Sequence, residues 1–172
     1  TLTAMNNLAQ LYKLQNRYEE AGPLYQEALG GYRRTLGARH PATLSVMSNL
    51  AALYLACERY PEAEPLFQTV LEVRLELLGD EHRSTLAAMN NLASLYRAQG
   101  RHDEARPLYE RALVIMRKVM GERHPNTVNL MNNLALLYKA QKRYDDAEGM
   151  YKEALEIMRD VLGEEHPNTV NL

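Results

Sequence analysis

The sequence predicts an all-α protein built as a solenoid of stacked antiparallel helix hairpins. The first observation is that Asn6-Asn7-Leu8-Ala9 returns at intervals of 42 residues, as Ser48-Asn49-Leu50-Ala51, Asn90-Asn91-Leu92-Ala93 and Asn132-Asn133-Leu134-Ala135. The second is the spacing of apolar residues within each repeat, which follows the i, i+3, i+4 pattern of a helix face. The third is that glycine and histidine interrupt this pattern at fixed places. A constant period of this length indicates repeats that stack on one another.

The first hairpin begins at the start of the chain. Apolar residues at positions 2, 5, 8, 9 and 12 predict a helix over residues 1–14, and residues 15–17 break its pattern. A second helix has its own apolar stripe and ends near Leu36. We predict the end there because Gly37 stands where a left-handed residue commonly stops a helix.

The later repeats follow the same plan. We expect further helices near residues 42–56, 61–78, 84–98, 103–120, 126–140 and 145–162. Pro41 and Pro61 each fall in the first turn of a helix, where the missing N–H costs little. Pro23, Pro65 and Pro107 lie about one turn further in, so each should remove one backbone hydrogen bond.

The whole chain, residues 1–172, is predicted to be a single array. Its repeats cover about 1–40, 41–82, 83–124 and 125–166, and residues 167–172 open a fifth. Because the first residue already lies inside a repeat, we expect the chain to be a piece of a longer array.

Neighbouring repeats must stabilise one another, since one hairpin cannot bury its own apolar face. Ala9 and Ala21 are small where the two helices of a hairpin must approach closely. Leu8, Tyr12 and Tyr25 supply the bulk that we expect neighbouring hairpins to share.

Composition excludes several classes of function. A net charge of −2 with 24% charged residues argues against general nucleic-acid binding. No apolar run approaches the roughly 18 residues of a membrane-spanning helix. Cys57 is the only cysteine and has no disulfide partner in the chain, which suits a reducing compartment such as the cytoplasm.

Catalysis, cofactors and metals are not expected. The sequence has no phosphate-binding loop, no Ser/His/Asp order and no paired-carboxylate motif. Cys57 is interpreted as a packing residue because no histidine is placed to activate it. The histidines recur at one place in each repeat, as His40, His82, His124 and His166. Equivalent atoms of stacked helices lie roughly 8–10 Å apart, whereas zinc ligands lie within about 2.0–2.1 Å of the ion, so loop or helix-capping roles are favoured.

Methionine also recurs at one place in the first helix, as Met5, Met47, Met89 and Met131. Such residues can form an adaptable binding surface. These four fall on the apolar side of the helix with the regularly spaced leucine and tyrosine, so core packing is favoured.

The residues Leu8, Ala9, Tyr12, Ala21, Tyr25 and Ala28, with their equivalents in the later repeats, resemble the tetratricopeptide repeat. The usual unit of that family is 34 residues. The longer form with Asn-Asn-Leu-Ala and Leu-Gly-x-x-His-Pro looks like the arrays of kinesin light chains, nephrocystin and some NACHT-type sensor proteins. The resemblance implies a right-handed superhelical solenoid whose first helices line a concave groove that binds a segment of another protein.

A polar stripe on the first helices is the candidate binding surface. Asparagine is a poor residue for the middle of a helix, so its recurrence there needs a reason. The resemblance implies that such asparagines hold the backbone of a bound peptide, and cations at the margin of the stripe would favour an acidic one. The candidate peptide-binding residues are Asn6, Asn7, Lys13, Asn49, Asn90, Asn91, Arg97, Asn132, Asn133 and Lys139.

Two alternatives remain open from the sequence. Asn7, Asn49, Asn91 and Asn133 can instead form hydrogen bonds between repeats and hold the stack together. The array as a whole can serve as a structural spacer or self-association module with no groove ligand.

The two ends of the array predict self-association. The last complete hairpin has no full neighbour to cover Tyr151 and Leu155, and only residues 167–172 could shield them. In a longer array such a face packs on the first helix of the next repeat, and the apolar residues near Leu2 and Met5 belong to a helix of that kind. We therefore expect concentration-dependent end-to-end association.

Overall fold

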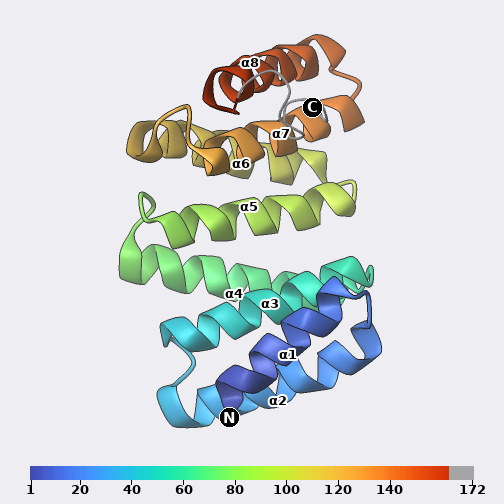
Figure 1. Ribbon diagram of the computed structural model, residues 1–172, viewed down its shortest axis with the longest axis vertical. Helices are drawn as coiled ribbons and strands as arrows, with labels where there is room; N and C mark the ends of the chain where they lie inside the picture. Colours follow the sequence, from blue (N-terminus) through green and yellow to red (C-terminus); the bar gives the residue numbers. More distant parts are fainter. Residues whose placement is uncertain (163–172) are drawn as a thin grey trace. The chain divides into compact units, whose positions relative to one another are not determined.

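The computed structural model describes residues 1–162 and contains eight α-helices and no strand within that range (Figure 1). The helices are α1 (Leu2–Leu14), α2 (Tyr18–Leu36), α3 (Pro41–Ala56), α4 (Tyr60–Leu78), α5 (Arg83–Ala98), α6 (His102–Met120), α7 (Pro125–Ala140) and α8 (Tyr144–Leu162). This confirms the all-α class, and each helix boundary predicted above agrees within one residue. The predicted opening of a fifth repeat at 167–172, with His166, lies outside the described residues.

The recurring histidines begin the first helix of each later hairpin. The Nδ1 atoms of His40, His82 and His124 accept the backbone N–H two residues ahead, at 3.2, 3.1 and 3.1 Å. Each imidazole thus satisfies one of the N–H groups that a helix start leaves without a partner. The predicted capping role is confirmed for these three.

The glycines that end the second helices differ from the prediction. Gly37 has φ 89° and ψ 162°, and Gly121 has φ 88° and ψ 161°. Their φ is positive, but ψ is extended, so they are not the left-handed helical residues that we expected. This backbone region is essentially open to glycine alone. Thr43 and Thr127, both fully buried, hold the glycine in place by donating to the Gly37 and Gly121 carbonyls at 2.7 and 2.8 Å.

The left-handed residues lie instead at the turn inside each hairpin. Their φ values are between 58° and 73°, at Asn16, Glu58, Gly100 and Lys142. The next residue is always arginine, whose N–H closes the turn; Arg17, for example, donates to the Tyr12 carbonyl at 2.9 Å. That bond is the 6→1 hydrogen bond of a Schellman motif, which joins residues five positions apart.

The same arginine fixes the turn with its side chain. In all four repeats the guanidinium lies 4.1–4.6 Å from the centre of a tyrosine ring on the first helix, as Arg17 does over Tyr12. It also pairs with an acidic residue three positions ahead, such as Glu104 beside Arg101 at 2.6 Å. The hydrogen bond from that arginine lowers the pKa of the Glu104 carboxyl.

The prolines lie where the sequence predicted. Pro41 and Pro61 are in the first turns of α3 and α4, and Pro125 has the corresponding place in α7. Pro23, Pro65 and Pro107 lie inside their helices, and each lacks the N–H that would otherwise continue the helix bonding. Gly149 takes this place in the fourth repeat.

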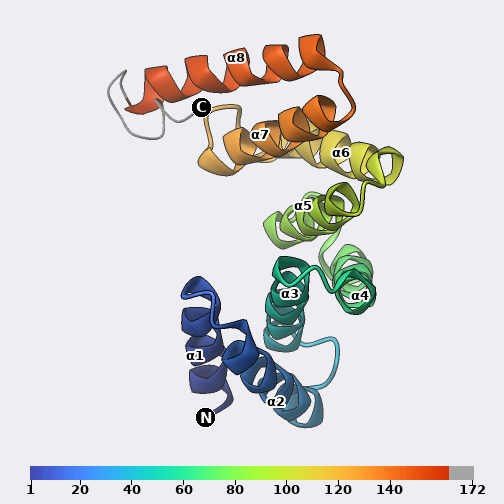
Figure 2. The same cartoon turned by 90° about the vertical axis from the view of Figure 1, so that its right-hand side faces the viewer.

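The chain forms two compact parts, Thr1–Leu77 and Leu78–Leu172. In the first part α1 packs on α2 and α2 on α3. In the second part α5 packs on α6, α6 on α7 and α7 on α8, a succession that Figure 2 shows. The first helices of neighbouring hairpins also touch, α1 with α3 and α5 with α7. Consecutive hairpins therefore pack as repeats within each part.

The core consists of the predicted small and bulky residues. Ala9, Ala21, Tyr25 and Tyr109 are completely buried. Met47, Met89 and Met131 are also buried, which confirms their packing role, while Met5 is half-buried.

Leu8 differs from the prediction that it packs between neighbouring hairpins. It is 40% exposed, whereas its equivalents Leu50, Leu92 and Leu134 are 2–4% exposed. The physical reason is that α1 has no preceding hairpin in the described chain.

Candidate functional site

The first helices of the third and fourth repeats form a shallow pocket of about 190 Å³. All of its residues belong to the second compact part. Five of the eight side chains are polar, and two of these are predicted binding residues. The lining residues are Arg83, Ala87 and Asn90 from α5, Met116 from α6, and Asn126, Asn129, Leu130 and Asn133 from α7.

The predicted asparagines join neighbouring repeats. Asn133 donates its amide N–H to Asn90 Oδ1 at 2.8 Å, between α7 and α5. In the first compact part Asn49 donates to Asn6 Oδ1 at 3.0 Å, between α3 and α1. The second asparagine of one repeat therefore binds the first asparagine of the repeat before it, which is the inter-repeat bond that the alternative interpretation predicted.

These bonds leave capacity for a ligand. A pair of amides has four N–H bonds and four oxygen lone pairs, and one hydrogen bond between them uses one of each. Asn90 and Asn133 are half-buried and line the pocket. Structural bonding and ligand binding by the same asparagines are thus compatible.

Asn126 and Asn129 add two exposed amides to the pocket. Asn129 replaces Thr3, Ser45 and Ala87 of the other repeats. The fourth repeat is therefore the richest in amides on this face.

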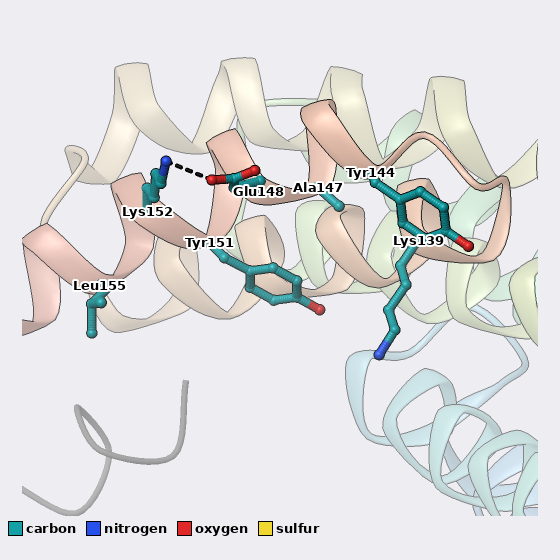
Figure 3. Close-up of a pocket in the computed structure, with 7 residues that line it drawn as sticks. All are labelled: Lys139, Tyr144, Ala147, Glu148, Tyr151, Lys152 and Leu155. Carbon is teal, nitrogen blue, oxygen red and sulfur yellow. Dashed lines mark ion pairs between the residues drawn. The ribbon is translucent and has the colours of Figure 1, made fainter.

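The predicted cations do not line this pocket. Lys139 lies at another pocket, between α7 and α8 (Figure 3). Arg97 is half-buried, with its Nε buried and unbonded in the described structure. Lys13 is on α1 in the first compact part, where burial lowers the pKa of its ammonium group.

The positive charge in the pocket comes from Arg83, which the sequence reasoning missed. Arg83 is exposed and is the first residue of α5. The other described repeats have Pro41 and Pro125 at this place. That departure from the His-Pro pattern at position 83 was the available signal in the sequence.

The remaining predicted residues lie on the same helices. Asn7 is exposed and accepts from Asn6 Nδ2 at 3.4 Å. Asn91 and Asn132 are half-buried, and the Asn132 Oδ1 atom is buried without a hydrogen-bond partner in the described structure. Neither lines the α5–α7 pocket.

Cys57 lies at a further pocket in the first compact part. It is half-buried at the C-terminal end of α3, and Tyr18, Tyr54 and Arg59 line the same pocket. Among the described residues, no group of three or more histidine, cysteine or acidic side chains could hold a metal ion. Within residues 1–162, every helix is too short or too polar to cross a membrane.

Comparison with known proteins agrees with this arrangement. The family model described as Tetratricopeptide repeat matches residues 1–76, 44–113, 84–160 and 130–172, which together cover the chain. The chain belongs to the tetratricopeptide-repeat family. No curated protein matches the chain in sequence.

Three solved structures are similar to this chain. A putative kinesin light chain of Podosopora anserina with nearly identical TPR-like repeats is 29% identical, with a TM-score of 0.86, and the match covers 99% of this chain and 81% of that one. A variant of that protein with one substitution gives a TM-score of 0.87 at 29% identity, covering 99% of this chain and 80% of that one. The crystal structure of BtubC (BKLC) from P. vanneervenii is 25% identical with a TM-score of 0.82, and the match covers 97% of this chain and 66% of that one.

Proposed function

We propose that this chain is a non-catalytic scaffold whose α5–α7 face binds an extended, acidic segment of a partner protein. The observation that carries the proposal is the pocket in which Arg83 meets Asn90, Asn126, Asn129 and Asn133. Membership of the tetratricopeptide-repeat family supports a role in protein–protein interaction, because these repeats generally mediate contacts between proteins.

The amides suit an extended peptide because each can both donate and accept. They can therefore satisfy the backbone of a bound chain whatever its side chains are. Arg83 adds a cation that pairs with a carboxylate and disfavours basic sequences. An exposed ion pair contributes only about 0–1 kcal/mol, so the amides and the apolar contacts to Met116 and Leu130 must provide most of the affinity.

The test begins with a phage-displayed library of random peptides, because the partner is unidentified. We expect the selected peptides to be enriched in aspartate and glutamate. Their dissociation constants are then measured by isothermal titration calorimetry at low and high salt.

Two substitutions already present in other repeats separate binding from folding. Arg83→Pro copies Pro41 and Pro125, and should weaken an acidic peptide by up to about fivefold and reduce its salt dependence. Asn129→Ala copies Ala87, and should weaken binding by up to about tenfold because it removes one hydrogen-bonding amide. Neither should lower the melting temperature.

Arg106→Gln is the matched control, since it removes one positive charge from α6 outside the pocket. It should leave peptide affinity close to that of the unchanged chain. Selected peptides without acidic enrichment, or equal losses in Arg83→Pro and Arg106→Gln, would contradict the proposal.

A second candidate function is a structural spacer, which the bonds between Asn6 and Asn49 and between Asn90 and Asn133 favour. In that case Asn49→Ala and Asn133→Ala should lower the free energy of unfolding by about 0.5–1.5 kcal/mol each. No peptide should then be selected on the α5–α7 face.

A further inference from the structure

We infer that two copies of this chain associate end to end, with α1 of one copy packing on the α7–α8 hairpin of the other. The inference is independent of the proposed peptide binding, because it uses neither Arg83 nor the amide pocket. It rests on two uncovered apolar faces and on how the same faces are covered inside the chain.

The first face is the outer side of α1. Leu8 and Leu11 are 40% and 49% exposed. Their equivalents in α3, Leu50 and Leu53, are 3% and 2% exposed, because α3 packs on α2 of the preceding repeat. The apolar stripe of α1 therefore has the pattern of a helix made to pack on a preceding hairpin.

The second face is formed by α7 and α8 (Figure 3). Tyr151 and Leu155 point to the same side of α8 and line a pocket of about 360 Å³. Both are half-buried, whereas the equivalent Tyr109 and Leu113 of α6 are 0% and 4% exposed. The greater exposure of Tyr151 and Leu155 shows how much of these two side chains a following hairpin would cover.

The inner repeats identify the occupant. Tyr109 and Leu113 lie on α6, which packs against α7, and Tyr25 lies on α2, which packs against α3. In each case the covering element is the first helix of the following repeat. The equivalent helix on this chain with an uncovered face is α1, so the occupant is α1 of a second copy.

A repeated hydrogen bond fixes the register of this contact. The Tyr54 hydroxyl on α3 accepts from Gln26 on α2 at 2.9 Å, and the Tyr138 hydroxyl on α7 donates to Glu110 on α6 at 3.1 Å. Tyr12 on α1 is the repeat equivalent of these two tyrosines, and Lys152 on α8 is the repeat equivalent of Gln26 and Glu110. In the associated pair the Lys152 ammonium of one copy donates to the Tyr12 hydroxyl of the other.

An interface between two different faces leaves a free face at each end of the pair. Because each free face can bind another copy, such a heterologous contact allows the assembly to grow beyond a dimer. The expected behaviour is therefore a mass that rises with concentration, without a fixed end point.

Mixing two blocked variants tests the inference. The head variant carries Leu8→Glu and Leu11→Glu, and the tail variant carries Leu155→Glu. Analytical ultracentrifugation from micromolar to millimolar concentration should show growth for the unchanged chain and a monomer for each variant. The association constant of each variant should fall by more than about tenfold, because a carboxylate would be buried without a partner. An equimolar mixture should form a dimer and nothing larger, since only one intact head and one intact tail remain.

Val114→Glu is the control, because Val114 is 69% exposed on α6 and its equivalents are Glu72 and Glu156. It should associate like the unchanged chain. If circular dichroism shows that Leu155→Glu does not fold, the smaller change Leu155→Ser replaces it as the tail variant.

Three results would overturn the inference. The unchanged chain could remain monomeric throughout, as it would if residues 163–172 of the same copy covered the face. The blocked variants could associate as strongly as the control. The mixture could stay monomeric, which would mean that the intact α1 face of one variant does not bind the intact α7–α8 face of the other.

Discussion

A single buried hydroxyl links the end of one repeat to the start of the next. Thr127 is completely buried and donates to the Gly121 carbonyl at 2.8 Å, and Thr43 does the same for Gly37 at 2.7 Å. The glycine backbone is in a conformation that residues with a side chain avoid, and this bond holds the glycine peptide in place. The threonine thus links local backbone geometry to the stacking of repeats.

Thr127→Val should lower the free energy of unfolding by about 1–3 kcal/mol, because the shape is kept while the Gly121 carbonyl loses its buried partner. Thr127→Ser retains the hydroxyl, so its free energy of unfolding should fall by less than that of Thr127→Val. Urea denaturation of the three proteins measures the difference. A valine variant as stable as the unchanged chain would show that water satisfies this carbonyl equally well.

At the scale of the helix, each hairpin turns through a left-handed residue. Gly100 fills this place in the third repeat, and Lys142, with φ 59°, fills it in the fourth. A left-handed conformation costs a residue with a side chain roughly 1–2 kcal/mol, while glycine loses about 0.5–1 kcal/mol more conformational entropy on folding. Glycine should therefore be the slightly better residue at this position.

Lys142→Gly should raise the free energy of unfolding by up to about 1 kcal/mol, and Gly100→Lys should lower it by a similar amount. The two substitutions are reciprocal and lie in the same compact part, so each serves as the control for the other. Thermal melting monitored by circular dichroism gives both values. Changes of the same sign would contradict the account of the turn.

The sequence predicted helices well because local signals mark their ends. His40 and Pro41 start α3, and the apolar period continues until a glycine or a polar turn interrupts it. The ψ angle of Gly37 was not predictable, since glycine permits several positive-φ regions and the buried Thr43 selects among them. Helix periodicity alone cannot supply that tertiary contact.

The candidate site was predictable only in part. The asparagine stripe followed from the repeat, and Asn90 does line the α5–α7 pocket. Helix periodicity also placed Lys139 beside the stripe, whereas it lines the pocket between α7 and α8. Arg83 was missed because it stands at a helix start, where the pattern predicts a proline with a purely structural role. Which side chains share a pocket depends on how neighbouring helices pack, and one-dimensional spacing does not contain that information.

For the whole molecule, the stability of a repeat should depend on whether a neighbour covers it. Tyr109 and Tyr151 occupy the same position in consecutive repeats of one compact part. Tyr109 is completely buried between its own hairpin and α7, whereas Tyr151 is half-buried. The same substitution at the two positions therefore measures the contribution of one inter-repeat interface, as a nearest-neighbour description of repeat proteins requires.

Tyr109→Ala should lower the free energy of unfolding by about 3–5 kcal/mol, the usual cost of removing a buried aromatic side chain. Tyr151→Ala should cost clearly less, because part of that side chain is already in contact with solvent. Tyr109→Phe corrects for the hydroxyl, which is 2.8 Å from Ser94 Oγ and has no counterpart at Leu136 in the fourth repeat. Urea denaturation is done at a concentration at which ultracentrifugation shows a monomer, so that association does not stabilise the Tyr151 face. Equal losses at the two positions under those conditions would show that the face is covered within the monomer, and would contradict both the nearest-neighbour account and the end-to-end contact.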